Sequence, residues 1–384
     1  MLSKIIILSI LAVAFLYELY FYFRYILIVP IYEHRRAKRL TTNDQQPGVS
    51  VILCAHNEAE NIEPYLQSLL TQDYPEFEVI VVNDGSEDKS QEILDAYQRH
   101  NPKLKLTFVP LEARILSTKK LGLTLAAKAA QYDYLLLTDA DCRPESNHWI
   151  SEMMSGFNDQ RPTTNDKRQK DIVLGYGGYF VEKGALNGLI RYDTLFNGLH
   201  YLGAAITGRP YMGVGRNVLY RKSFFFNVGG FSKQMSVRAG DDDRFINAYA
   251  THANTAVVCS RDSVTWSVPK TSFIEWIKQK RRHLGVSPKY RLASRLHLTL
   301  EPFMRGLFYL TLIVICACFT WDVITVALAA FAIRLFLQYV IINAGALLLG
   351  QGRVTLLMMV WDIVLPLITL YLLLTKSLHK NNRW

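Results

Sequence analysis

The chain has 384 residues, half of them hydrophobic, and a formal net charge of +10 at pH 7. This charge does not indicate nucleic-acid binding, because the basic residues gather beside long apolar blocks, at residues 34–39 and 278–295, as they do at a membrane surface. Its five cysteines lack C-x-x-C spacing, which argues against a zinc site or a disulfide framework and favours a reducing compartment.

Residues 5–31 form an apolar and aromatic block near the N-terminus. At about 1.5 Å per helical residue the block is long enough to cross a bilayer, and it lacks a clear small-x-small cleavage site. We therefore expect a retained membrane anchor over residues 1–31, followed by a basic juxtamembrane linker at 32–48. The cluster Arg35–Arg39 predicts a cytoplasmic domain in a multi-pass protein of the cell membrane, with a bacterial inner membrane as the expected location.

Residues 49–269 have the composition of a soluble domain in which buried strands alternate with amphipathic helices. The apolar runs predict a strand at 49–58, which ends in polar residues, and further strands at 77–82, 104–109 and 134–138. The helical spacing of apolar residues predicts helices at 60–71, 90–100 and 119–131. This alternation indicates an α/β fold with a Rossmann-like, mostly parallel, doubly wound sheet.

The pattern changes after residue 171, where the predicted strands become shorter and glycine becomes more frequent. We expect short Gly-rich strands at 171–192, a glycine-studded segment at 208–222, helices at 196–205 and 245–252, and a strand at 255–260. Residues 272–284 place large apolar side chains opposite lysines and arginines, which is typical of an amphipathic helix at a membrane interface. We assign residues 270–300 to such interface helices.

Three apolar blocks follow, at residues 303–321, 323–349 and 354–375. Each approaches the ~20 residues that a spanning helix needs, so we expect C-terminal transmembrane helices over 301–376. Arg334, Gln338 and Asp362 inside these blocks should face protein or a cavity, because polar side chains are costly in lipid. Three spans after a cytoplasmic domain would place the basic C-terminal residues outside, against the positive-inside trend. A re-entrant or interfacial block is therefore the open alternative.

Asp139 and Asp141 follow the apolar run 134–138, at the carboxyl end of a predicted parallel strand. Open α/β sheets bind ligands at this edge, and two converging carboxylates suit a hard divalent cation that holds a diphosphate. The alternative is a strand followed by an acidic turn, because Asp is common at loop starts.

Polar residues elsewhere in the domain could either bind substrate and take part in catalysis or have a purely structural role. The structural alternatives are a helix cap for Asn57 and Glu58, a turn for Asp84, a solvated helix position for Lys119, a helix cap for residues 241–243, and contact with lipid head groups for Arg282.

Taken in order, these segments resemble the family 2 glycosyltransferases, which are inverting, metal-dependent enzymes with the GT-A fold. The resemblance covers roughly residues 49–290. The segment 54–58 is similar to the family's nucleotide-binding entry strand. Asn83-Asp84-Gly85-Ser86 is similar to its D-D-G-S turn, with Asn83 in place of the first acid. The resemblance implies that Asp84 accepts a hydrogen bond from a uracil N3–H group.

The resemblance also implies which residues meet the diphosphate of the donor. Lys119 is similar to the family's lysine at this position, although Lys120 is a close rival. Asp139 and Asp141 match the D-x-D pair, of which Asp141 would bind a divalent metal, Mg²⁺ or Mn²⁺, directly. Donor-binding positions are thereby implied for His56, Asn57, Glu58, Asp84, Lys119, Asp139, Gln279 and Arg282.

Three later segments resemble the family's acceptor side and its catalytic base. Residues 211–217 resemble the acceptor-side loop. Gly240-Asp241-Asp242 occupies the place of the T-E-D motif, so Asp242 is the expected base and Asp241 replaces the glutamate. Residues 279–283 resemble Q-x-x-R-W with His283 in place of tryptophan, which leaves acceptor type and processivity open. Acceptor-side positions are thereby implied for Gly213, Gly215, Arg216, Asn217 and His283.

The expected function is that of a membrane-embedded transferase. It would move a sugar from a UDP-linked donor to a hydroxyl group of a lipid or polysaccharide. The reaction would be one in-line displacement at the anomeric carbon, with inversion. The alternatives are a processive polysaccharide synthase and a catalytically silent nucleotide-sugar-binding scaffold. A dinucleotide oxidoreductase is disfavoured, because no G-x-G-x-x-G follows the first strand.

Overall fold

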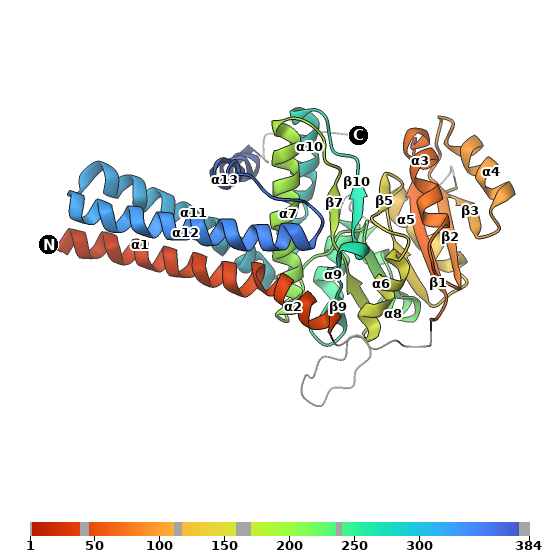
Figure 1. Cartoon of the computed structure of the whole chain (residues 1–384). Helices are drawn as coiled ribbons and strands as arrows, with labels where there is room; N and C mark the ends of the chain where they lie inside the picture. The colour runs from red at the N-terminus through yellow and green to blue at the C-terminus, as the bar shows by residue number, and fades with distance from the viewer. Residues whose placement is uncertain (1, 39–45, 111–116, 159–169, 236–239, 376–384) are drawn as a thin grey trace.

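The computed structural model describes residues 2–38, 46–110, 117–158, 170–235 and 240–375. An elongated helical bundle lies at one end of the molecule and an α/β domain at the other, with helix α7 between them (Figure 1). The strands are β1 (Val49–Ala55), β2 (Phe77–Asn83), β3 (Leu104–Phe108), β4 (Tyr134–Leu137), β5 (Cys142–Pro144), β6 (Ile172–Leu174), β7 (Gly177–Tyr179), β8 (Val218–Arg221), β9 (Thr255–Val257) and β10 (Thr265–Ser267).

The helices of the domain alternate with these strands, and longer helices form the bundle. In the domain they are α3 (Ala59–Leu70), α4 (Ser90–His100), α5 (Thr118–Ala129), α6 (Trp149–Ser155), α7 (Ala185–Ile206), α8 (Lys222–Asn227), α9 (Asp241–Tyr249) and α10 (Phe273–Leu284). The remaining helices are α1 (Leu2–Phe21), the π-helical turn η1 (Tyr22–Ile26), α2 (Ile28–Ala37), α11 (Leu292–Cys318), α12 (Trp321–Leu348) and α13 (Met358–Leu374).

The main sheet has seven strands in the order β3-β2-β1-β4-β8-β6-β9 among the described residues. Strands β1 to β4 are mutually parallel, as predicted, whereas β8 runs antiparallel to both β4 and β6. Alternate residues of β1 enter two different cores, because successive side chains of a strand point to opposite faces. Val51 and Leu53 pack with Leu66 of α3, whereas Ile52 packs with Leu123 of α5. This two-sided burial explains the continuous apolar run in the sequence.

A second sheet of three strands, in the order β5-β10-β7, lies beside the first. Strand β10 pairs antiparallel with β5 and parallel with β7. The register places Ser267 opposite both Cys142 and Tyr179, so these three residues form one row across the small sheet. The chain therefore passes from the main sheet to the small sheet between β4 and β5, where the D-x-D pair lies.

Within the described residues, three helical segments are long and apolar enough to cross a membrane, namely residues 2–37, 292–318 and 321–348. Helices α1, α11 and α12 run alongside one another, whereas the shorter α13 lies across them near α7 and α10 (Figure 1). The third apolar block thus differs in length and direction from the other two. The first of these segments continues to Ala37 and α11 begins at Leu292, so both extend beyond the boundaries expected at residues 31 and 301.

A network of charged side chains joins the helices of the bundle. Arg334 binds Glu18 of α1 at 3.0 Å and Asp362 of α13 at 2.9 Å, and its side chain is fully buried. Arg305 of α11 binds Asp362 at 2.9 Å, and Gln338 donates to the same carboxylate at 2.8 Å. The expectation that Arg334, Gln338 and Asp362 face protein is therefore confirmed, and pairing is what makes these charges tolerable in an apolar bundle.

The basic cluster after the anchor is partly used inside the protein. Arg36 is buried, and its guanidinium binds Glu33 at 2.9 Å and Glu152 of α6 at 3.1 Å. These bonds join α2 to the α/β domain, whereas Arg39 lies outside the described residues. Arg36 thus joins the bundle to the domain.

Two elements begin earlier than the sequence predicted. Helix α7 starts at Ala185, inside the region expected to hold short strands, and α9 starts at Asp241 instead of Phe245. The side chain of Asn187 explains the first difference: it accepts from the Glu182 amide at 3.0 Å and donates to the Phe180 carbonyl at 3.0 Å, which fixes the turn into the helix. A turn fixed by side-chain hydrogen bonds cannot be recognised from the periodicity of apolar residues.

Candidate active site

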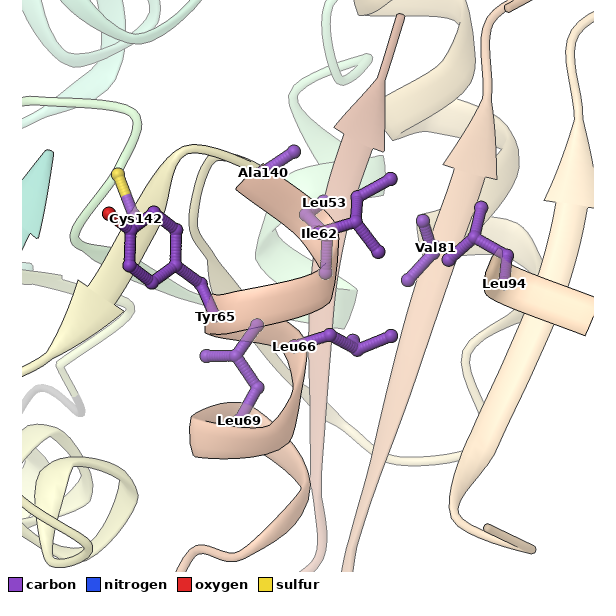
Figure 2. Close-up of a pocket in the computed structure, with 9 residues that line it drawn as sticks. All are labelled: Leu53, Ile62, Tyr65, Leu66, Leu69, Val81, Leu94, Ala140 and Cys142. Atoms are coloured by element: carbon purple, nitrogen blue, oxygen red, sulfur yellow. The ribbon is translucent and has the colours of Figure 1, made fainter. Parts of the chain in front are cut away.

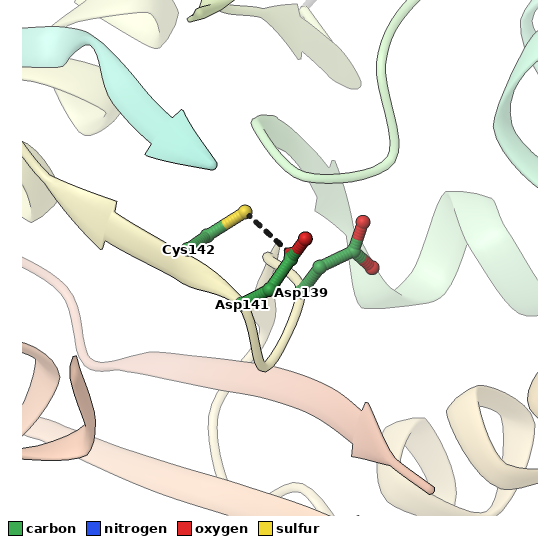
Figure 3. A group of neighbouring side chains, drawn as sticks. All are labelled: Asp139, Asp141 and Cys142. Carbon is green, nitrogen blue, oxygen red and sulfur yellow. Dashed lines mark hydrogen bonds between the residues drawn. The ribbon is translucent and has the colours of Figure 1, made fainter. Parts of the chain in front are cut away.

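The two acids of the D-x-D pair lie in the turn that links the sheets. Asp139 and Asp141 follow β4, and the Cys142 amide closes the turn on the Asp139 carbonyl at 3.2 Å. A ligand atom of each of these three residues lies within 4.8 Å of the others (Figure 3). Hard cations prefer oxygen ligands, so the two carboxylates fit a divalent ion such as Mg²⁺ or Mn²⁺, whereas the thiol is too soft a donor for it.

Cys142 is the member of this group that the sequence did not single out. Its Sγ atom hydrogen-bonds Asp141 Oδ1 at 3.3 Å and contacts Ser267 Oγ at 2.9 Å. The signal available in the sequence was its position directly after the D-x-D pair. Only the pairing of β5 with β10 shows that this thiol lies beside the carboxylates.

The structure distinguishes the two candidate lysines at the start of α5. Lys119 Nζ donates to Asp139 Oδ1 at 2.6 Å, with 42% of its side chain exposed. Lys120 is buried and donates to the Gln234 carbonyl at 3.2 Å. Consecutive residues of a helix point in directions about 100° apart, so one of the two faces the acids and the other faces the core.

The surroundings of the D-x-D pair shift the pKa values of its two carboxyl groups in opposite directions. Burial alone would raise the pKa of Asp139, but the positive charges of Lys119 and Arg216 hold this pKa below its ordinary value. Burial and then the negative charge of Asp139 raise the pKa of Asp141. The exposed Arg282 of α10 also lowers the pKa of Asp139, which places its charge within reach of the pair.

The ends of β1 and β2 form a second polar region at the same edge of the sheet. Asp84 Oδ2 accepts from Thr118 Oγ1 at 2.6 Å, and the Asp84 carbonyl lies 2.6 Å from His56 Nδ1. Asn57 has a φ of 56°, in the left-handed region that Asn tolerates better than most residues. Thr118, at the start of α5, was not anticipated, and its bond holds Asp84 toward that helix.

Asn57 holds the adjacent loop, and the Glu58 carboxylate accepts from Asn61 Nδ2 at 2.6 Å instead of capping an amide of α3. The Asn57 amide donates to Ser86 Oγ at 3.0 Å, and its side-chain oxygen accepts from the Glu87 amide at 2.8 Å. The first amide of α3, at Ala59, is bonded by Asp88 Oδ2 at 3.0 Å. Burial raises the pKa of Glu58, and the nearby D-x-D carboxylates raise it further. These contacts favour a role of the two residues in the candidate site over a role as side-chain caps of α3.

The glycine segment lies between the D-x-D pair and α9. The Gly215 amide donates to Asp242 Oδ2, and a Cβ atom at Gly215 would lie 3.0 Å from that oxygen. Gly213 packs against Leu174, where an added Cβ would lie 2.9 Å from Leu174 Cδ2. Asn217 is buried, and it donates to the Tyr176 and Ser263 carbonyls at 2.7 Å each. Asn217 thus anchors the segment, and Gly215 brings it against Asp242.

Helix α9 presents its acids in different directions. Gly240 precedes it with a φ of +76°, and a Cβ there would lie 2.5 Å from Val286 Cγ1, so glycine is required. Asp242 is partly exposed and faces the glycine segment, whereas Asp243 is buried and raises the pKa of the Tyr290 phenol, after the larger effect of burial. The side chain of Asp241 lies outside the described residues.

Helix α10 reaches the small sheet through Gln279. Its Nε2 atom donates to Tyr179 Oη at 3.1 Å, and the Tyr179 ring in turn stacks on the guanidinium of Arg216 at 4.6 Å. Tyr179 was not anticipated, because nothing local in the sequence marks it. His283 is exposed, and Trp276, expected at a membrane interface, is buried against the protein.

A small cavity lies beneath the D-x-D turn, between α3 and strands β1 and β2 (Figure 2). It holds about 10 Å³ and is lined by apolar residues, chiefly Leu53, Ile62, Leu66 and Val81. Ligand sites span roughly 300 Å³ or more, so this cavity is a packing gap and not a substrate site.

The geometry defines a GT-A fold, with a D-x-D turn at the carboxyl edge of a parallel sheet. A mannosyltransferase from Pyrobaculum calidifontis, solved in complex with GDP-Man and Mn²⁺, shares this fold, with a TM-score of 0.54 and 19% identity over 88% of this chain and 99% of that one. Residues 50–200 match the model of glycosyl transferase family 2. Residues 50–200 are therefore similar to the family 2 glycosyltransferases, and the fold agrees with that similarity.

Curated relatives match parts of the same region. A poly-beta-1,6-N-acetyl-D-glucosamine synthase of Staphylococcus aureus (strain COL) is 32% identical over 197 residues, which are 50% of this chain and 44% of the relative. A protein of the same name from Staphylococcus epidermidis is 35% identical over 99 residues, 26% of this chain and 23% of the relative. The matched regions thus span less than half the length of these relatives.

Proposed function

We propose that this protein is a membrane-bound inverting glycosyltransferase, which moves a sugar from a nucleotide-sugar donor, UDP-linked, to a hydroxyl of a lipid or polysaccharide acceptor. The observation that carries the proposal is the ion pair of Lys119 with the D-x-D turn, at the carboxyl edge of a family 2 domain. This edge is where doubly wound sheets bind nucleotides.

The donor would lie across the ends of β1, β2 and β4. Asp84 accepts from the base, and His56, Asn57 and Glu58 hold the loop that surrounds it. Asp139 and Asp141 would hold a divalent cation, which when bound neutralises the charge of the diphosphate. Lys119 and Arg282 place further positive charge where the leaving group develops its negative charge.

Asp242 is the proposed base. It takes the proton from the acceptor hydroxyl, whose oxygen attacks the anomeric carbon while the bond to the diphosphate breaks on the opposite side. The bond from the Gly215 amide orients this carboxyl group. The base must not be bound to the metal. Asp242 meets this requirement, because it lies on α9 and the D-x-D pair lies between β4 and β5.

The proposed topology has the α/β domain in the cytoplasm, where nucleotide sugars are made. The three long helices would then span, and α13, which is shorter and lies across them, would be the interfacial block. With an even number of crossings after the domain, the chain that follows α13 would remain on the cytoplasmic side, in agreement with the positive-inside trend.

The proposal is tested with the full chain in detergent, incubated with UDP- and GDP-sugars and Mn²⁺, by measuring release of the nucleoside diphosphate. We expect release from at least one donor, its loss in Asp141→Asn, and its retention in Asp133→Asn, an exposed acid near the start of β4. Nucleotide binding without release would instead identify a silent scaffold, and absence of both would overturn the proposal.

A processive polysaccharide synthase is the second candidate, because the curated relatives carry the name of such a synthase. The length of the product distinguishes the two. A polymer that forms before the acceptor is consumed indicates a processive synthase, whereas a single added sugar indicates a simple transferase.

A further inference from the structure

Arg216 has an unusual set of contacts for a partly buried cation. Its Nη2 atom donates to the Gly177 carbonyl at 2.6 Å, and its guanidinium stacks on the Tyr179 ring at 4.6 Å. Its Nε atom is out of contact with water and has no hydrogen-bond partner. Within the described part of the chain, no carboxylate lies at ion-pair distance from it. A desolvated guanidinium normally has an anionic partner.

The surroundings of Arg216 place it on the donor side of the site. It stacks on Tyr179, which shares a row of the small sheet with Ser267 and Cys142, next to the D-x-D turn. Its positive charge lowers the pKa of Asp139 and opposes the rise in the pKa of Asp141. Tyr179 also binds Gln279, from the helix that carries Arg282. The position of Arg216 in the glycine segment had implied the acceptor side.

We infer that Arg216 is a donor-binding residue, whose guanidinium binds the diphosphate of the nucleotide donor next to the D-x-D turn. This inference rests on the proposed function and adds a residue to it. A guanidinium presents five N–H donors in a planar fork, which matches the geometry of phosphate oxygens. The diphosphate supplies the anion that the protein itself does not place beside this side chain.

Two neighbouring glycines explain how Arg216 reaches this position. A Cβ atom at Gly177 would collide with the Arg216 Nε atom, so strand β7 leaves the space that the guanidinium occupies. Gly215, directly before Arg216, donates its amide to Asp242. One dipeptide therefore connects the proposed base with the proposed diphosphate site.

The test measures binding and not turnover. Dissociation constants of UDP, GDP and the free nucleosides uridine and guanosine are determined with Mn²⁺ for the full chain in detergent. We expect Arg216→Gln to weaken binding of the preferred diphosphate by roughly 10- to 100-fold, as expected for a lost hydrogen bond to a charged group. Binding of the matching nucleoside, which lacks phosphate, should not change.

Two further variants complete the design. Gly177→Ala keeps the charge but displaces the guanidinium, so it should weaken diphosphate binding without affecting the nucleoside, and it decides the question if Arg216→Gln fails to fold. Arg221→Gln is the matched control, because this arginine of β8 pairs with Asp171 at 3.5 Å. It should leave both affinities unchanged.

The outcomes separate the inference from the proposed function. If the unmodified chain binds neither diphosphate, the proposed function and the inference both fail. If it binds one and neither Arg216→Gln nor Gly177→Ala weakens it, only the inference is wrong. An equal loss for diphosphate and nucleoside would show that Arg216 merely supports the fold, and would also overturn the inference.

Discussion

Replacing Asp242 by asparagine tests the role of the proposed base without changing the residues that bind the donor. A positioned general base contributes roughly 10²- to 10⁴-fold to a rate, which corresponds to about 3–5 kcal/mol of barrier. We therefore expect Asp242→Asn to reduce kcat by this factor. The base acts on the acceptor in the transition state, so the dissociation constant of the donor should not change.

The structure indicates that asparagine leaves the fold intact. Its side-chain oxygen can still accept the Gly215 amide, so a charge-assisted hydrogen bond becomes a neutral one, at a cost of about 1 kcal/mol. Alanine would instead leave that amide without its partner, at about 1–3 kcal/mol. The expected change in the barrier thus exceeds the expected change in stability, and thermal unfolding in detergent checks the second quantity.

The assay compares Asp241→Asn, Asp242→Asn and Asp243→Asn under identical conditions, with initial rates at saturating donor and calorimetric binding of the nucleoside diphosphate. Asp243→Asn should mainly affect stability, because this acid is buried near Tyr290. Normal turnover of Asp242→Asn with an inactive Asp241→Asn would shift the base by one residue. Normal turnover of all three variants would show that the run is only a helix cap.

Three further predictions concern the metal, the bundle and the topology. Asp141→Ala should abolish turnover and weaken donor binding because the diphosphate loses its counter-ion, whereas full activity in EDTA would contradict metal dependence. Asp362→Ala should destabilise the protein by about 3–5 kcal/mol, because it leaves two buried arginines short of an anion. In the same thermal unfolding measurement Asp322→Ala, which breaks an exposed pair with Lys4, should shift the midpoint far less, because solvent screens an exposed ion pair. A reporter inserted after Arg39 should behave as cytoplasmic, and an external signal would refute the proposed topology.

The sequence by itself determined the elements whose signal is local. A strand buried on both faces needs a continuous apolar run, so the runs that begin at Val49 and Phe77 identified β1 and β2, and chain order then gave the parallel sheet. The D-x-D pair was recognisable because it directly follows such a run. Arg334 and Asp362 were expected to face protein, because an unpaired charge in an apolar block has no other stable place.

Tertiary structure decided the features that depend on which segments meet. Lys119 and Lys120 are equivalent in sequence, and only the docking of α5 on the sheet turns one toward Asp139 and the other into the core. The row of Cys142 with Tyr179 exists because two short strands pair with β10, far away along the chain. Arg216 is near the D-x-D turn for the same reason. Such contacts are set by packing between distant residues, and the spacing of residues along one segment carries no record of them.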